Sequence, residues 1–239
     1  MKRDIHKYSE IGGRDRNEDC VDYREYGENL VAVVADGLGG QGDGDIASRT
    51  VCESLIRCGE DGKLPDKGSV KAAFEKANRE LMAKQKNAFH MKTTAVYLSL
   101  CQNRAIWAHI GDSRLYHIKD GKLVDYTLDH SASQMAVFMG QITREEIPTD
   151  PGQHMLLRAM GVAEETPDIH EPIVLEKGKH VFLLCSDGLW EYLTDGEIEL
   201  AAAKYATVQQ FLAGLTALKL TRSPNDCDNS SAVAVFVEV

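Results

Sequence analysis

The chain has 239 residues, 43% of them hydrophobic, which is enough for one sizeable core, and we expect a single catalytic-size domain over residues 1–239. Its 27 lysines and arginines against 37 aspartates and glutamates give a net charge of −10, which disfavours tight nucleic-acid binding. No stretch approaches the roughly 20 apolar residues of a membrane span, and the six cysteines form no CxxC pair, so we expect a cytoplasmic protein with reduced thiols.

Apolar runs and helical spacing divide the chain into strands and helices. The apolar runs predict strands over residues 29–35, 94–100, 105–110, 114–118, 180–185 and 231–239. Apolar residues spaced three and four apart predict helices over residues 46–58, 69–86, 131–139, 195–203 and 208–220. The strands come in blocks and the helices in pairs, which favours antiparallel sheets with segregated helices over a doubly wound fold.

The segment GGRDRNEDC, residues 12–20, places two arginines beside two acids. These are Arg14, Arg16, Glu18 and Asp19. Acidic side chains can hold cations that neutralise phosphoryl oxygens, and a guanidinium can grip two such oxygens in a fork. The segment therefore suggests a phosphate ligand. Either arginine could instead be an ordinary surface residue, and Arg16 is the one we expect to be solvated or ion-paired.

Aspartates stand at the ends of several apolar strands. LVAVVADGLGG places Asp36-Gly37 after the first strand, and VFLLCSDGLW repeats the Asp-Gly pair at Asp187. One such pair is usually a turn. A repeated pair suggests carboxylates at strand mouths, with a glycine that allows close backbone approach. Asp112 follows a third apolar run, and Asp228 precedes the last strand.

These carboxylates converge at one edge if the strands pair side by side. Their mutual repulsion could then reach several kcal/mol without a compensating charge. Hard divalent cations supply that charge, and oxygen ligands without histidine or cysteine at metal spacing favour magnesium or manganese over zinc. The sequence therefore predicts a site for Mn²⁺ or Mg²⁺.

Other polar and aromatic residues have a structural interpretation. We expect Asp129 to cap the helix that begins near residue 131, and His109 to be a buried, hydrogen-bonded histidine. The remaining structural assignments are Trp107 and Trp190 in the core, Thr93 and Thr94 at a strand start, and Asp226 in a turn.

Seven short motifs appear in the order of a known family. They are NED, DGLGG, the Thr93-Thr94 pair, GDSR, DHS, CSDGLW and the Asp228-Asn229 pair. The chain resembles a bacterial-type member of the protein phosphatase 2C family over nearly its whole length. The resemblance implies an α+β fold, a four-layer αββα sandwich of two antiparallel β-sheets flanked by helix pairs, with metals at one end.

The resemblance also implies the ligands of two metals. Asp36 resembles the catalytic carboxylate that bridges both ions. Asp187 and Asp228 resemble ligands of the first metal, and Glu18 and the Gly37 carbonyl resemble ligands of the second.

Further positions match the surroundings of that centre. Arg14 resembles the arginine that binds substrate phosphate, and Asp19 resembles a neighbour that acts through water. Asp112 matches the ligand of a third, weaker metal in the bacterial branch. Residues 132–152 fall where the family carries a mobile flap, and we expect a short helix at 144–147.

Two positions depart from the family pattern. Many eukaryotic relatives place a histidine after the Asp-Gly pair, where it protonates the leaving group, but this chain has Leu38. We expect a metal-bound water to replace it. His154 stands near the RAMG segment without matching the bacterial pattern, and we assign it no role.

The implied activity is hydrolysis of phosphoserine and phosphothreonine by a water activated between two Mn²⁺ or Mg²⁺ ions per chain, with a third ion at Asp112. The expected partners are phosphorylated proteins, substrates of a Ser/Thr kinase, with no nucleic acid and no membrane, and we expect a monomer. Two other classes stay open. One is a catalytically silent regulatory module of the same fold, and the other is a two-metal phosphoesterase that acts on small molecules.

Overall fold

The computed structural model describes residues 2–38, 43–85 and 91–239. Its strands are β1 (Lys2–Glu10), β2 (Asp19–Tyr26), β3 (Asn29–Leu38), β4 (Lys92–Thr93), β5 (Ala95–Cys101), β6 (Arg104–Ile110), β7 (Arg114–Lys119), β8 (Lys122–Tyr126), β9 (Asp168–Ile169), β10 (Ile173–Val174), β11 (Lys179–Cys185) and β12 (Ser230–Glu238). Its helices are α1 (Gly44–Ile56), α2 (Lys67–Met82), α3 (Ala132–Phe138), α4 (Asp187–Trp190), α5 (Asp195–Lys204) and α6 (Val208–Leu220), with 3₁₀ helices η1 (Arg57–Gly59) and η2 (Arg144–Thr149).

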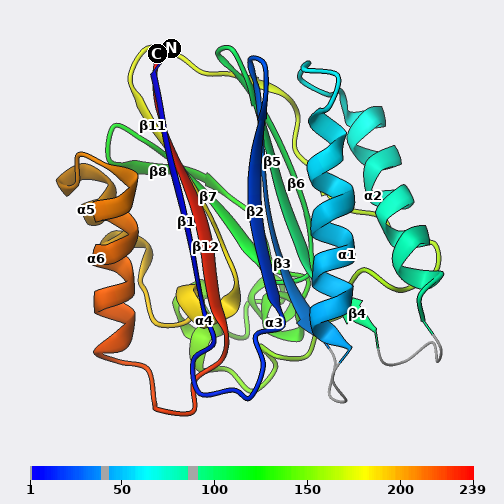
Figure 1. The fold of residues 1–239 in the computed structure, drawn as a ribbon. Helices are drawn as coiled ribbons and strands as arrows, with labels where there is room; N and C mark the ends of the chain where they lie inside the picture. The colour runs from blue at the N-terminus through cyan, green and yellow to red at the C-terminus, as the bar shows by residue number, and fades with distance from the viewer. Residues whose placement is uncertain (1, 39–42, 86–90) are drawn as a thin grey trace.

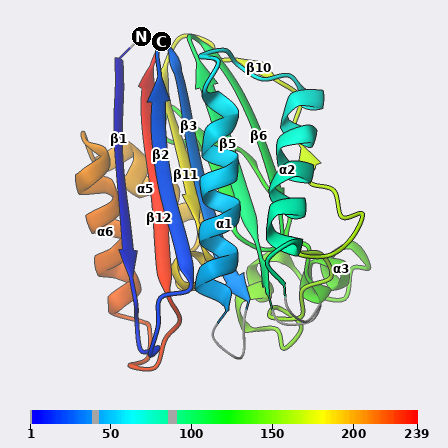
Figure 2. The same cartoon turned by 45° about the vertical axis from the view of Figure 1, so that its right-hand side comes forward.

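Two antiparallel sheets form the middle of the molecule. One has the strand order β1-β12-β11-β7-β8, and the other has the order β10-β6-β5-β3-β2, with β4 paired to β3 and β9 paired to β6. Helices α5 and α6 cover the outer face of the first sheet, and α1 and α2 cover the outer face of the second (Figure 1). Figure 2 shows α1 lying along the sheet that contains β2, β3 and β5. The expected four-layer αββα sandwich is confirmed.

The side chains of β3 alternate between two apolar layers, as strand geometry requires. Leu30 and Val34 point into the layer between the sheets, where they join Phe182 of β11. Val31 and Val33 point the other way, into the layer under α1 and α2. Because both faces of the central strands are covered, they are apolar at nearly every position, which is why the sequence shows them as continuous apolar runs.

Strand ends that carry the acidic motifs meet at one end of the sandwich. Asp19 at the start of β2 pairs with Asp36 near the end of β3. In the other sheet, Cys185 at the end of β11 pairs with Ala232 at the start of β12. Figure 1 shows these ends opposite the N- and C-termini. The topology therefore brings distant acidic segments to one edge.

The helices and central strands lie close to the predicted ranges. α6 has the predicted bounds, and α1 is shifted by two residues toward the N-terminus. α2 ends at Met82, and Lys86, the last residue predicted for it, lies outside the described residues. Strands β1, β2, β4, β8, β9 and β10 were not predicted. Within residues 2–38, 43–85 and 91–239, no helix is both long and apolar enough to span a bilayer.

The prediction that Asp129 caps a helix is wrong. Ser131 caps α3 with its side chain, which accepts from the Gln134 amide. Asp129 instead accepts from Arg114 Nε at 2.8 Å and Nη2 at 2.7 Å, in a buried two-pronged ion pair. The guanidinium also lies 3.4 Å from the ring centre of Trp190. A buried guanidinium needs a counter-charge, and that need outweighs the local capping preference.

The remaining structural assignments are confirmed by burial or by position in a turn. Trp107 and Trp190 are core residues. His109 is buried, and its Nε2 lies 2.7 Å from the Leu128 carbonyl oxygen. Asp226 is exposed in the turn before β12.

Candidate metal centre

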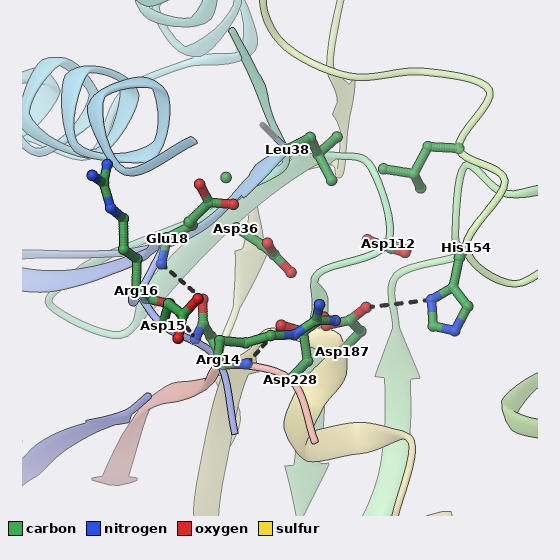
Figure 3. Close-up of a pocket in the computed structure, with 13 residues that line it drawn as sticks. Arg14, Asp15, Arg16, Glu18, Asp36, Leu38, Asp112, His154, Asp187 and Asp228 are labelled. Carbon is green, nitrogen blue, oxygen red and sulfur yellow. Dashed lines mark hydrogen bonds and ion pairs between the residues drawn. The ribbon is translucent and has the colours of Figure 1, made fainter. Parts of the chain in front are cut away.

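A cavity of about 640 Å³ opens at the end of the sandwich where the acidic strand ends meet (Figure 3). It is lined by Arg14, Asp15, Arg16, Glu18, Asp36, Gly37, Leu38, Asp112, His154, Leu156, Asp187, Asp228 and Asn229. Every residue with a predicted metal or phosphate role is on this wall except Asp19. Gly39 and Gly40 of the DGLGG motif lie outside the described residues.

Asp36 reaches the cavity from β3, and two threonines hold its backbone. The Asp36 amide donates to Thr94 Oγ1 at 3.0 Å, and the Asp36 carbonyl accepts from the Thr93 hydroxyl at 2.7 Å. Both threonines therefore have the structural role that we expected. Burial, with the charges of Asp19 and Asp187, raises the pKa of Asp36 well above its ordinary value.

The chain after Asp36 passes so close to its neighbours that residue 37 must be glycine. A Cβ at Gly37 would lie 2.2 Å from the Gly44 carbonyl oxygen and 2.7 Å from that of Glu18. The Gly37 amide donates to the same Glu18 carbonyl at 3.1 Å. This contact sets the Glu18 side chain beside Gly44, where burial raises the pKa of its carboxyl group.

Asp112 and Asp187 approach the cavity from the ends of β6 and β11. Asp112 lies in the loop between β6 and β7, and Asp187 begins α4. Both are buried, and burial raises the pKa of each, with a further contribution to Asp112 from the charge of Asp187 and to Asp187 from that of Asp228. Oδ1 of Asp187 is buried and has no hydrogen-bond partner in the described part of the chain.

Arg14 and Asp228 form an ion pair at the cavity mouth, with Nη2 2.6 Å from Oδ2 (Figure 3). The Arg14 side chain is 56% exposed, so its guanidinium also borders solvent. The charge of Asp228 raises the pKa of Arg14. Asp228 is oriented further by its own Oδ1, which accepts from the Asn229 amide at 2.7 Å.

Asp19 lies behind the wall of the cavity. Its Oδ2 accepts from the Ser186 hydroxyl at 2.8 Å, while its buried Oδ1 has no partner among the residues described. Burial raises the pKa of Asp19 to about 7. Asp19 is therefore absent from the cavity lining although it pairs with Asp36 across the sheet, a position compatible with an indirect role.

The donor set fits hard divalent cations. Burial, together with the charges of neighbouring aspartates, raises the pKa values of Asp36, Asp112 and Asp187, and a divalent cation would stabilise their ionised forms. The unpartnered buried oxygens of Asp19 and Asp187 provide free lone pairs in the same region. Carboxylate and carbonyl oxygens are the ligands that Mg²⁺ and Mn²⁺ prefer.

Sequence reasoning missed three residues that shape the site. Asn229 joins two segments, because its Oδ1 accepts from the Glu18 amide and its Nδ2 donates to the carbonyls of Ile11 and Arg16. The Asp228-Asn229 pair in the sequence was the available indication. The second residue is His154, which lines the cavity with its Nδ1 4.0 Å from Asp187 Oδ2. The third is Glu191, which stands one helical turn after Asp187. Neither residue belongs to one of the seven motifs.

Comparison with known proteins gives the same family as the motifs. The family model described as protein phosphatase 2C matches residues 8–221. The protein phosphatase PhpP of Streptococcus pneumoniae is 31% identical over 192 residues, which cover 77% of this chain and 78% of PhpP. The serine/threonine protein phosphatase PstP of Mycobacterium tuberculosis is 30% identical over 212 residues, which cover 84% of this chain and 40% of PstP.

Solved structures extend the similarity to the whole chain. The crystal structure of M. tuberculosis PstP/Ppp superposes with a TM-score of 0.87 at 30% identity, covering 99% of each chain. A structure of the PstP catalytic domain in complex with two manganese ions gives a TM-score of 0.83 at 28% identity, again with 99% of each chain covered. The acidic cavity at the end of an αββα sandwich and these matches agree: the chain belongs to the protein phosphatase 2C family.

Proposed function

We propose that this chain is a metal-dependent protein serine/threonine phosphatase that hydrolyses phosphoserine and phosphothreonine in other proteins. One observation carries the proposal: carboxylates from separate segments line one cavity that has an arginine at its mouth. They are Glu18, Asp36, Asp112, Asp187 and Asp228. The names of the relatives, which are protein phosphatases, and the two manganese ions of the PstP structure support it.

In this proposal Asp36 would contribute to holding both of two divalent cations. Asp187 and Asp228 would hold the first cation, and Glu18 and the Gly37 carbonyl would hold the second. When bound, such cations supply an activated water near neutral pH and neutralise charge on phosphoryl oxygens. The carboxylates fix the geometry, and Asp19 supports the centre through its bond to Ser186. Asp112 would hold a third cation.

Arg14 binds and orients the substrate phosphate. Its guanidinium stands at the cavity mouth, beside Asp228 and in contact with solvent. A planar guanidinium can donate two parallel hydrogen bonds to phosphoryl oxygens, which both positions the phosphate and stabilises its charge. Phosphate and Asp228 therefore compete for the same donor, and Arg14 turns toward the phosphate when a substrate arrives.

Leu38 cannot protonate the departing serine or threonine oxygen. It lines the cavity at the position where many eukaryotic relatives carry a histidine, and its side chain has no exchangeable proton. In this proposal a water molecule in the cavity donates that proton.

The same proposal covers the setting of the enzyme. Residues 1–239 form one catalytic domain that acts as a monomer on substrates of a Ser/Thr kinase. Residues 132–152, which contain α3 and η2, form a flap beside the cavity. The six cysteines are all free, which supports a reducing, cytoplasmic compartment.

Asp228→Asn, with Asp226→Asn as its matched control, tests the proposal. The two aspartates stand two residues apart in the turn before β12, but only Asp228 lines the cavity. With Mn²⁺ present, we expect Asp228→Asn to lower kcat/KM for a phosphothreonine peptide on the order of 100-fold or more, and Asp226→Asn to leave it unchanged. A chelator should abolish turnover of the unmodified chain.

The competing functions give different results in the same assay. A silent module shows no Mn²⁺-dependent turnover with any phosphate ester. A small-molecule phosphoesterase cleaves a nucleotide or an aryl phosphate well and the phosphopeptides poorly. Unchanged peptide hydrolysis by Asp228→Asn would exclude the metal centre as described.

A further inference from the structure

A second group of potential metal ligands lies at the rim of the cavity and includes a nitrogen donor. His154 Nδ1 is 4.0 Å from Asp187 Oδ2 and 3.9 Å from Glu191 Oε1. One ligand atom from each of the three residues can be chosen so that all lie within 4.8 Å of one another. Figure 3 shows the His154 ring pointing at the Asp187 carboxylate from the opposite side to Arg14.

The two carboxylates are arranged before any ion arrives. Asp187 is the first residue of α4 and Glu191 is its C-cap, so the two side chains lie one turn apart on the same helix face. Gln153 Nε2 donates to Glu191 Oε1 and orients that carboxylate. Asp187 is buried, and its Oδ1 makes no hydrogen bond within the described residues. Asp187 therefore keeps one unpartnered carboxylate oxygen, and a third potential ligand, His154, lies near its other oxygen, Oδ2.

The three side chains lie slightly farther apart than they would around one ion. Metal–nitrogen and metal–oxygen bonds of about 2.0–2.2 Å place the ligand atoms of a tetrahedral ion about 3.3–3.6 Å apart. The separations from His154 Nδ1, 4.0 Å to Asp187 and 3.9 Å to Glu191, exceed that spacing by only a few tenths of an ångström. His154 is 69% exposed and follows η2 in a loop, so a small movement of its ring can bring the ligands closer.

The alternative is that His154 is only an imidazolium paired with two carboxylates. An exposed pair of this kind contributes little and needs neither carboxylate to be oriented. The Glu191 and Asp187 side chains are both at most 13% exposed, and Gln153 holds the Glu191 carboxylate in place. Gathering these buried groups on one helix turn is better explained by an ion of higher charge.

We propose that His154, Asp187 and Glu191 form an additional site at the cavity rim for a transition-metal ion, with Zn²⁺ or Mn²⁺ favoured over Mg²⁺. The imidazole nitrogen is the reason for this preference, since nitrogen donors suit zinc and other transition metals, while Mg²⁺ selects oxygen donors. The site uses neither Asp36 nor Asp112. It shares Asp187 with the proposed catalytic centre, so an ion at the rim would compete for, or bridge through, a catalytic ligand.

Zinc binding in excess Mg²⁺ tests the rim site directly. Calorimetric titration with Zn²⁺ in a large excess of Mg²⁺ leaves the oxygen-only positions largely occupied by Mg²⁺. We expect the unmodified chain to bind one Zn²⁺ under these conditions. His154→Ala and Glu191→Gln should each weaken that binding by at least about tenfold, because each removes a direct ligand. His6→Ala, which removes an exposed histidine on β1, is the matched control and should bind Zn²⁺ as the unmodified chain does.

Cobalt supplies a second, spectroscopic measurement. Co²⁺ in place of Zn²⁺ has visible absorption bands that respond to ligand type, and we expect His154→Ala to change them while His6→Ala does not. Zn²⁺ affinity unchanged in His154→Ala, or no Zn²⁺ bound by the unmodified chain in Mg²⁺, overturns the rim site. These experiments measure metal binding and not turnover. The rim site can therefore be disproved while the proposed phosphatase activity is upheld, and the phosphatase activity can be disproved while the rim site is upheld.

Discussion

The side chains of the cavity have neighbours that orient them without neutralising them. Thr93 and Thr94 bind the backbone of Asp36, and the charges that raise the pKa of its carboxyl group, after burial, are those of other acids. Asp228 differs, because Arg14 lies 2.6 Å from it. Arg14 thus has two possible partners, a carboxylate of the site and the phosphate of a substrate. Substitutions at Arg14 distinguish its effect on metal binding from its effect on substrate binding.

Arg14→Lys should weaken substrate binding more than metal binding. Lysine keeps the positive charge but loses the fork that grips two phosphoryl oxygens. We expect KM for a phosphopeptide to rise about tenfold with a smaller change in kcat, and Mn²⁺ affinity measured by calorimetry to stay within about twofold. Arg16→Lys is the control, because Arg16 also lines the cavity. Equal effects of the two substitutions would show that Arg14 has no special contact with phosphate.

Asp129→Asn should destabilise the fold even though Asp129 has no metal role. The Arg114 and Asp129 side chains are 7% and 1% exposed, so the variant leaves a guanidinium buried without its counter-charge. We expect the free energy of unfolding in urea to fall by about 3–5 kcal/mol. The double variant Arg114→Leu/Asp129→Leu removes both charges and should recover part of that loss. If the single variant costs under about 1 kcal/mol, the ion pair does not stabilise this loop.

At the scale of elements, the central strands could be predicted from sequence and the edge strands could not. β3, β5, β11 and β12 are covered on both faces and are apolar at most positions, so their apolar runs stand out in the sequence. Four of the missed strands, β1, β2, β8 and β10, are the edges of the two sheets, and they carry charged residues such as those in the KRDIHKYSE of β1. Charged residues on an edge strand protect the sheet from pairing with other chains. They also remove the apolar pattern from which the strand could be predicted in the sequence.

The residues of the candidate metal centre, like the strands, were only partly predictable from the sequence. Carboxylates at ends of central strands were predictable, because strand ends in one sheet must meet at an edge. Asp129 was interpreted wrongly because its partner, Arg114, is 15 residues away and only folding brings them together. His154 lies in a loop, and no local pattern indicates that a loop residue faces Asp187.

His109 on β6 should make stability depend on pH. Burial and the neighbouring His130 lower the pKa of His109 to about 4. The unfolded chain takes up this proton near pH 6.5, so it binds more protons than the folded chain between about pH 6.5 and 4. The contribution of His109 to stability is therefore complete above pH 6.5 and is lost as the pH falls toward 4. A shift of this size corresponds to about 3 kcal/mol.

Comparing His109→Gln with the unmodified chain isolates this effect from the acids of the cavity, whose raised pKa values act in the opposite direction. Glutamine can still donate to the Leu128 carbonyl but does not titrate. The difference in unfolding free energy between the two chains should narrow by about 2–3 kcal/mol between pH 7 and pH 4.5. A difference that is constant with pH would mean that His109 is protonated equally easily in both states.

At the scale of the whole molecule, the sandwich gathers the carboxylates of the cavity at one end. Three apolar layers hold the sheets and helices together. The acids of the cavity stand on strand ends and on the segments between them, at the end opposite the termini (Figure 1). Folding therefore brings the carboxylates of the cavity together against their mutual repulsion. Cations that bind only the folded state should offset this unfavourable contribution to the free energy of folding. Metal affinity and fold stability are linked through the same side chains.

The Asp36→Asn substitution should separate metal affinity from the stability of the fold. Without metal, in a chelator, the variant should melt at a higher temperature than the unmodified chain, because one of the mutually repelling buried carboxylates has become neutral. At Mn²⁺ about 100-fold above Kd, the unmodified chain should gain about 2.7 kcal/mol, or about 5–10 °C in Tm. Asp36→Asn should gain little, while the control Asp226→Asn should follow the unmodified chain in both conditions. A lower Tm for Asp36→Asn in chelator would show that Asp36 stabilises the fold through hydrogen bonds, and that these bonds outweigh the repulsion between carboxylates at the cavity.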